Sequence, residues 1–170
     1  MFSLCSDGII AVSEGCADEI RKVFPNLVKQ GINITAIHTP LPFQQPQQTS
    51  EEFTSKENIV VYSGRLERTH KNAMMAIKCW REIHETHPDW TMKILGDGSL
   101  REAMERYAKE NNIRNVVFEG FVENMEAQLQ RSSIAILTSD YEGLPMAFVE
   151  AAMYSNCLLY TSDAADDDRG

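Results

Sequence analysis

The stretch IAILTSDYEGLPMAFVEA, residues 134–151, decides the fold because it joins an apolar strand to a helix through a short polar turn. The apolar run of residues 134–137 stops at Thr138. Pro145 suits a first helical turn, where its missing N–H would be unbonded anyway, so we expect the helix to begin near Leu144. A helix that starts at the carboxyl end of a parallel strand points its free amides toward that edge, where anions bind.

Two carboxylates bracket this turn. Glu142 precedes the predicted helix, and Glu150 lies about two turns along it. Two acids gain little from sharing an exposed helix face, whereas a ligand rich in hydroxyl groups would give both a partner. The alternative is that Glu142 only favours the helix dipole and that Glu150 lies on a solvated face.

The second half of the chain alternates strands and helices from Asn58 onward, which is typical of an α/β fold with a Rossmann-like parallel sheet and helices on both faces. We expect strands at residues 59–62, 91–95, 115–119 and 134–137. We expect helices at residues 73–87, from Ser99 onward, and at 125–131. Ser99 and Glu102 have the spacing of a capping box.

The first half contains two short apolar runs. Residues 7–12 end at Ser13, a candidate N-cap for the helix that follows, and residues 34–38 lead into a glutamine-rich, proline-containing stretch. We therefore expect a strand at residues 34–38, a linker at residues 43–57 and a second folded domain at residues 58–156.

Composition restricts the possible functions. The 170 residues are 43% hydrophobic and 24% charged, which fits a globular fold, and the net charge of -9 argues against a broad nucleic-acid surface. A phosphate ligand would need a local cluster of cations. No run is long enough to span a bilayer. Four cysteines without metal-ligand spacing, and no signal peptide, indicate a reducing cytoplasm.

The end of the chain changes character. Residues 157–167, CLLYTSDAADD, resemble the translation of a transposon-type sequencing adapter, so we expect residues 157–170 to be a non-native tail. A genuine acidic tail is the alternative. Within this segment, residues 157–160 are apolar enough to dock as an edge strand.

The segment EGLPMAFVEA resembles the E-x7-E signature of the retaining nucleotide-sugar glycosyltransferases of the GT-B fold, specifically the group 1 family. The resemblance covers about residues 58–153 and is weaker upstream. It implies that residues 1–42 are the end of an N-terminal, acceptor-binding domain and its hinge, and that residues 58–156 are an incomplete donor-binding domain. It implies that Glu142 is catalytic and lies beside the transferred sugar, and that Glu150 hydrogen-bonds the ribose of the nucleotide. It also implies that the backbone around Gly143 and Leu144 faces the sugar and the phosphates.

Two cations fit the same resemblance. Arg65 follows the first strand of the second domain, and Lys71 comes six positions later at the head of the next helix. Arginine binds phosphate oxygens through two parallel hydrogen bonds, and lysine adds a point charge. The family uses a matching pair for the donor pyrophosphate, usually without a required metal. Taken alone, the two residues would also fit solvated surface charge.

Glycines mark several predicted strand ends. Gly64, Gly96 and Gly98 would let the backbone approach a phosphate or sugar, although turns need glycine regardless. The turn at residues 120–122 resembles a family turn that borders the nucleobase. We therefore expect Val122 to contact the base through its backbone, and we expect Phe121 to belong to the core.

The resemblance implies the donor-binding half of a glycosyltransferase that transfers a sugar from a nucleotide-sugar, expected to be a UDP-sugar, to a saccharide or lipid-linked acceptor. No cofactor or metal and no nucleic acid is implied. The acceptor would bind a missing N-terminal domain, so Met1 is not expected to begin a complete enzyme, and this chain alone should catalyse little. The full enzyme would act in polysaccharide biosynthesis in the cytoplasm, with peripheral contact at the inner membrane face. Alternatives are a non-catalytic nucleotide- or phosphosugar-binding module and a GT-B nucleotide-sugar epimerase.

Overall fold

The computed structural model describes residues 7–38, 40, 56–68, 71–140, 142 and 145–160. The chain divides into two compact units, Met1–Pro42 and Phe43–Gly170. Each unit has its own buried apolar cluster.

The first unit is a pair of parallel strands with two helices between them. Strands β1 (Gly8–Ala11) and β2 (Asn33–Ala36) are joined through α1 (Glu14–Val23) and α2 (Pro25–Lys29). The Ser13 hydroxyl accepts a hydrogen bond from the Cys16 amide at 3.2 Å, which confirms the predicted N-cap. A small cluster around Ala17 and Ile34 forms the buried core of this unit.

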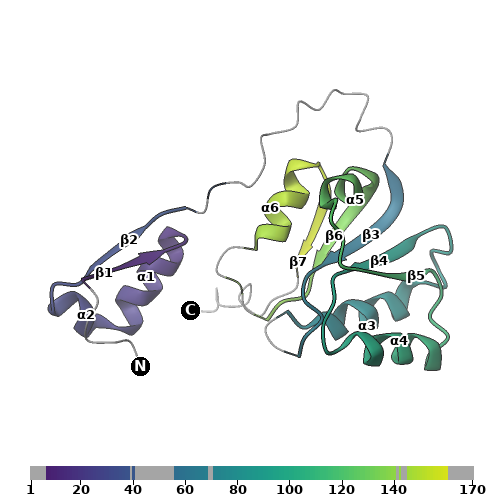
Figure 1. Cartoon of the computed structure of the whole chain (residues 1–170), viewed down its shortest axis with the longest axis horizontal. Helices are drawn as coiled ribbons and strands as arrows, with labels where there is room; N and C mark the ends of the chain where they lie inside the picture. The colour runs from purple at the N-terminus through teal and green to yellow at the C-terminus, as the bar shows by residue number, and fades with distance from the viewer. Residues whose placement is uncertain are drawn as a thin grey trace. The chain divides into compact units, whose positions relative to one another are not determined.

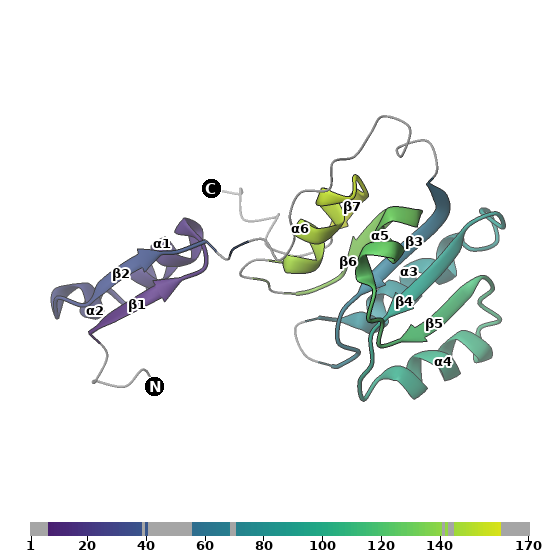
Figure 2. The same ribbon diagram turned by 45° about the horizontal axis from the view of Figure 1, so that its top comes forward.

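The second unit is a five-stranded parallel sheet with the strand order β5-β4-β3-β6-β7. The strands are β3 (Glu57–Ser63), β4 (Thr91–Leu95), β5 (Val116–Gly120), β6 (Ser132–Leu137) and β7 (Cys157–Tyr160). The helices are α3 (Ala73–Ile83), α4 (Arg101–Glu110), α5 (Met125–Arg131) and α6 (Met146–Met153). Helices α3 and α4 cover one face, and α5 and α6 cover the other (Figures 1 and 2). The predicted fold class is confirmed.

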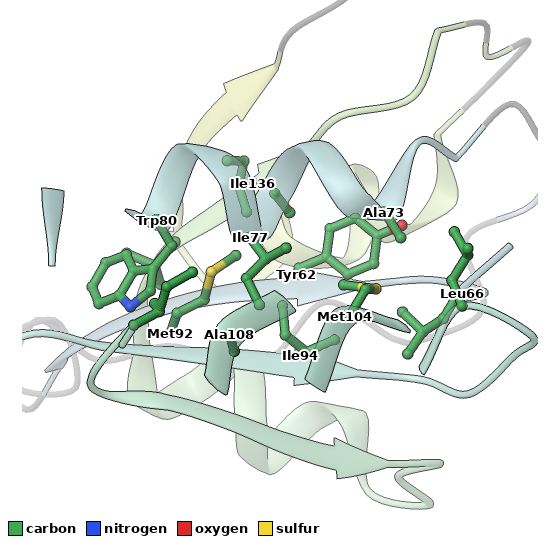
Figure 3. Packing of buried hydrophobic residues seen from close by; sticks show 14 residues of the cluster. Tyr62, Leu66, Ala73, Ile77, Trp80, Met92, Ile94, Met104, Ala108 and Ile136 are labelled. Carbon is green, nitrogen blue, oxygen red and sulfur yellow. The ribbon is translucent and has the colours of Figure 1, made fainter. Parts of the chain in front are cut away.

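Each face of the sheet packs against its own pair of helices. On one face, Ile77 and Trp80 of α3 point toward the sheet residue Met92, as Figure 3 shows. On the other face, Leu129 of α5 and Ala151 of α6 pack on the remaining strand side chains. Burial of a side chain such as Ile77 contributes about 1.5 to 3 kcal/mol. Burial on both faces explains why the central strands read as continuous apolar runs.

The strand order determines where a ligand can bind. Strand β3 lies beside β6 at the centre of the sheet, and the connection after β3 runs to one face while that after β6 runs to the other. In open parallel sheets the crevice at such a switch point, at the carboxyl ends of the strands, is the usual ligand site. Here it lies beyond Ser63 and Leu137.

One predicted helix start is shifted by two residues, and another lacks its predicted cap. Helix α6 begins at Met146, and Pro145 occupies the N-cap position with a non-helical ψ of 87° instead of the first turn. The Ser99–Glu102 capping box is absent at α4, whose N-cap is Leu100 without a side-chain cap. The Leu100 amide instead donates to the Leu66 carbonyl at 2.8 Å, so a tertiary contact replaces the local one.

The last described strand lies inside the predicted tail. Residues Cys157–Tyr160 pair in parallel with β6, as expected for an apolar edge strand. Residues 161–170 and most of the predicted linker lie outside the described residues. The adapter origin of the tail stays a prediction.

Candidate functional site

The loop that carries Arg65 is held against the loop that follows β4. The Leu66 amide donates to the Asp97 carbonyl at 3.0 Å, and Gly96 has a φ of +130°. A Cβ atom on Gly96 would lie 2.0 Å from the carbonyl oxygen of Gly64. The glycine therefore allows two loops to approach each other, a structural role that the sequence did not predict. The contact between the two loops fixes the position of the backbone at Arg65.

A cavity of about 360 Å³ opens at this edge of the sheet. Its lining comes from the ends of β3 and β4 and from the segment after β5, and it includes Arg65 and Val122. Two residues predicted to contact different parts of one ligand therefore line one space.

Phe121 is a correction to the sequence prediction. Its side chain is 82% exposed and lines the same cavity, so it does not belong to the core. Gly120 has a φ of +74° and ends β5, so the next side chain no longer follows the strand alternation that would turn it inward.

Lys71 and Glu142 meet across the crevice. Lys71 precedes α3, and Glu142 follows β6, yet the Lys71 Nζ lies 2.6 Å from the Glu142 Oε1. The Glu142 side chain is only 12% exposed, and that of Lys71 is 36% exposed. An ion pair joining positions 71 residues apart brings together one predicted phosphate-binding cation and the predicted catalytic carboxylate.

Buried hydroxyl groups hold the backbone beside this pair. The Tyr62 hydroxyl donates to the Lys71 carbonyl at 3.3 Å, and the Thr138 hydroxyl donates to the Asn72 carbonyl at 3.0 Å. Burial, and after it the charge of Glu142, raises the pKa of Tyr62, so its hydroxyl remains a donor at neutral pH. The sequence analysis did not predict roles for Tyr62 or Asn72, because each looked like an ordinary strand or helix-start residue.

Glu150 lies on α6, where burial raises the pKa of its carboxyl group. Among the described residues, the structure shows no hydrogen bond or ion pair between Glu150 and the other predicted site residues. Ser139, near the end of β6, is fully buried, and its hydroxyl has no hydrogen-bond partner among the residues that the structure describes. Gly143 and Leu144 lie outside the described residues, so their roles stay predictions.

The described ranges contain neither a metal-binding group nor a membrane-spanning helix. Within them, no three His, Cys, Asp or Glu side chains gather as a metal-binding group. No helix in these ranges has the length and apolar character needed to cross a bilayer. The expectation that no metal is required stays a prediction.

Curated proteins similar to this chain are glycosyltransferases by name. An alpha-1,4-N-acetyl-D-galactosaminyltransferase of Campylobacter jejuni is 33% identical over 108 residues, which cover 63% of this chain and 30% of that protein. Glycogen synthase of Mycobacterium tuberculosis is 30% identical over 154 residues, which cover 86% of this chain and 35% of that protein. The chain thus spans about a third of the length of these relatives.

Solved structures share the fold. The pneumococcal O-GlcNAc transferase GtfA, in complex with UDP and GlcNAc, matches 91% of this chain and 30% of its own, with a TM-score of 0.73 and 16% identity. Anabaena Alr3699/HepE, in complex with UDP and glucose, matches 95% of this chain and 46% of its own, with a TM-score of 0.68 and 14% identity.

A family model matches most of the second unit. The model described as "Glycosyl transferases group 1" matches residues 43–164, which is more than half of the chain and includes the whole described sheet of the second unit. The chain therefore belongs to the group 1 family of glycosyl transferases.

Proposed function

We propose that the Phe43–Gly170 unit binds the nucleotide-sugar donor, a UDP-sugar, of a retaining glycosyltransferase. The observation that carries the proposal is that Arg65 and Val122 line one cavity at the carboxyl edge, while Lys71 and Glu142 meet at the neighbouring strand ends. Solved structures of the same fold hold UDP and a sugar, which supports the choice of donor. The acceptor is a saccharide or a lipid-linked saccharide bound by another part of a longer enzyme.

The base end of the donor occupies the cavity. Phe121 offers an exposed aromatic ring, and Val122 offers backbone groups at the same turn. A volume of about 360 Å³ lies within the range of small-molecule pockets. Arg65 lines the cavity as well, so the nucleotide and its diphosphate can be held by adjoining residues.

The diphosphate end needs positive charge. As the bond between the sugar and the diphosphate breaks, negative charge grows on the leaving phosphate, and Arg65 and Lys71 stabilise it. Glu142 accepts hydrogen bonds from the sugar, and the backbone of Gly143 and Leu144 completes that contact. Glu150 binds the ribose, whose hydroxyl groups would solvate a carboxylate that burial disfavours.

The enzyme works without a required metal in this proposal. It acts in the cytoplasm in polysaccharide biosynthesis, with peripheral contact at the inner membrane face where the acceptor is lipid-linked.

Removal of the two cations tests the donor site. Arg65→Ala and Lys71→Ala should each weaken UDP binding in calorimetry, because a lost charge-assisted contact costs about 1.5 to 3 kcal/mol. Arg131→Ala, at the amino edge of the sheet, and Lys78→Ala, on the exposed side of α3, are matched controls that should bind UDP as the unaltered chain does. If neither site variant loses affinity, the assignment of the diphosphate site is wrong.

Turnover by a longer version that contains both domains tests the reaction. Transfer from UDP-sugar to a saccharide should give a product with the anomeric configuration of the donor, as measured by NMR. UDP binding without transfer would favour a non-catalytic module. Interconversion of UDP-sugars without an acceptor would favour an epimerase.

A further inference from the structure

Asn72 behaves unusually for a residue at the start of a helix. It occupies the N-cap position of α3 with a left-handed φ of +42°, and its side chain makes no capping hydrogen bond. An asparagine at this position usually accepts a hydrogen bond from the first turn of its own helix. Here its Nδ2 instead donates to the Asp140 Oδ1 at 2.8 Å, across 68 residues of sequence.

This contact lies next to the Lys71–Glu142 ion pair. Two consecutive residues at the head of α3 are thus bridged to two residues, Asp140 and Glu142, of the segment that follows β6. A single bridge would leave the two segments free to rotate about it. Two bridges restrain both their separation and their relative orientation.

Stability does not account for the Asn72–Asp140 bridge. The bond is exposed, and exposed polar pairs contribute little to the free energy of unfolding. A left-handed backbone at a residue other than glycine carries a cost of its own. The backbone at this point is already anchored by the buried Thr138 and Tyr62 hydroxyls. The bridge is therefore redundant for attaching the backbone of α3 to the sheet.

We propose that Asn72 and Asp140 are positioning residues that hold Lys71 and Glu142 in register, so that one donor molecule can meet the cation with its diphosphate and the carboxylate with its sugar. This inference rests on the proposed function. In this role Asn72 and Asp140 act through Lys71 and Glu142, each from one side of the crevice.

The affinity of this chain for UDP, measured by calorimetry, tests the inference. Asp140→Ala removes the acceptor, and Asn72→Gly removes the amide but keeps left-handed freedom, so each should weaken binding about three- to tenfold. The double variant Asn72→Asp, Asp140→Asn exchanges donor and acceptor and should return the affinity to within about twofold of the unaltered chain.

A matched control lies at the opposite edge of the sheet. Asn58 donates to Asp89 at 2.8 Å through the same pair of chemical groups, also exposed. Asp89→Ala should therefore leave UDP affinity within about twofold of the unaltered chain. If Asp140→Ala behaves like Asp89→Ala, the positioning role is wrong.

A second measurement requires no ligand. The coupling between Lys71→Met and Glu142→Gln, obtained from the melting temperatures of a double-mutant cycle, should fall by about half or more when the cycle is repeated with Asp140→Ala. A chain that binds no UDP would refute the proposed function, and this cycle would then decide the inference by itself. Unchanged coupling overturns the inference in either case.

Discussion

The two edges of the second unit's sheet use similar polar residues in different ways. At the amino edge, the Lys56 ammonium donates to the carbonyl oxygens of Leu129, Ser132 and Tyr154 at 3.0, 2.8 and 2.5 Å. At the carboxyl edge, Lys71 instead faces one carboxylate across a crevice. A cation whose hydrogen-bond partners all come from the fold stabilises the fold, whereas a cation at an open crevice can also bind a ligand.

Arg131 and Arg65 show the same difference. At the amino edge, Arg131 binds both carboxylate oxygens of Glu57, at 2.6 and 3.0 Å. At the carboxyl edge, Arg65 lines a cavity and forms no ion pair with any residue that the structure describes. Within the described residues, the buried Ser139 hydroxyl at this edge has no hydrogen-bond partner, and at the amino edge the Asn156 Oδ1 has none either. The contrast between the two edges therefore rests on their cations.

Gly96 lets two loops approach each other at the carboxyl edge of the sheet, and its substitution should lower the free energy of unfolding the most. Gly96→Ala should lower the free energy of unfolding by about 3 kcal/mol, because the added Cβ would meet a backbone oxygen at 2.0 Å in a left-handed conformation. Gly120→Ala is the control: its φ is also positive, but its Cβ would meet the flexible end of Arg101. It should cost only about 1 kcal/mol. Equal losses in urea denaturation would show that loop contact is unimportant.

Lys56 lies at the amino edge of the sheet, away from the candidate site, so its substitution should lower stability without changing ligand binding. Lys56→Met should lower the free energy of unfolding by about 2 kcal/mol, because the carbonyl oxygens at the ends of α5 and α6 lose their shared donor. UDP affinity should not change. Arg131→Ala, an exposed cation on the same edge, should lower the melting temperature far less. A loss of UDP affinity in Lys56→Met would contradict the division between the edges.

Most helices and strands of the second unit were predictable, because the spacing of apolar residues along a helix or strand shows which of its sides is buried. Strand β4 and helix α5 have the predicted bounds. Each end of strands β3, β5 and β6 lies within two residues of its predicted position. Helix α3 ends at Ile83, four residues before the predicted end, because the residues after it form turns. The spacing of apolar residues does not predict where a helix ends, because single hydrogen bonds determine that position.

The residues of the candidate site could be chosen from the sequence, but the contacts between them could not be predicted. Arg65, Lys71, Val122 and Glu142 were chosen from spacing and resemblance, but pattern cannot show that Lys71 contacts Glu142, since that contact depends on the strand order. Phe121 was misplaced because one positive φ at the preceding glycine reverses the expected direction of its side chain.

The fold shifts the pKa values of Glu150 and Glu57 in opposite directions. Burial raises the pKa of Glu150 above its ordinary 4.5, whereas a hydrogen bond from Arg131 lowers the pKa of Glu57. The folded state therefore disfavours the ionised form of Glu150 and favours that of Glu57. The penalty at Glu150 is absent well below pH 4.5 and complete once the pH exceeds the raised pKa.

Glu150→Gln should consequently raise the melting temperature at pH 7 by at most about 3 °C, and it should have no such effect at pH 3.5. Glu57→Gln should lower the melting temperature at pH 7, because it removes a charge that the fold favours. Calorimetric scans at the two pH values measure both. A stability gain at pH 7 combined with weaker UDP binding in Glu150→Gln would show a carboxylate kept for a ligand at the expense of the fold. A lower melting temperature at pH 7 would instead mean that the fold itself satisfies Glu150, and the ribose assignment would lose its physical basis.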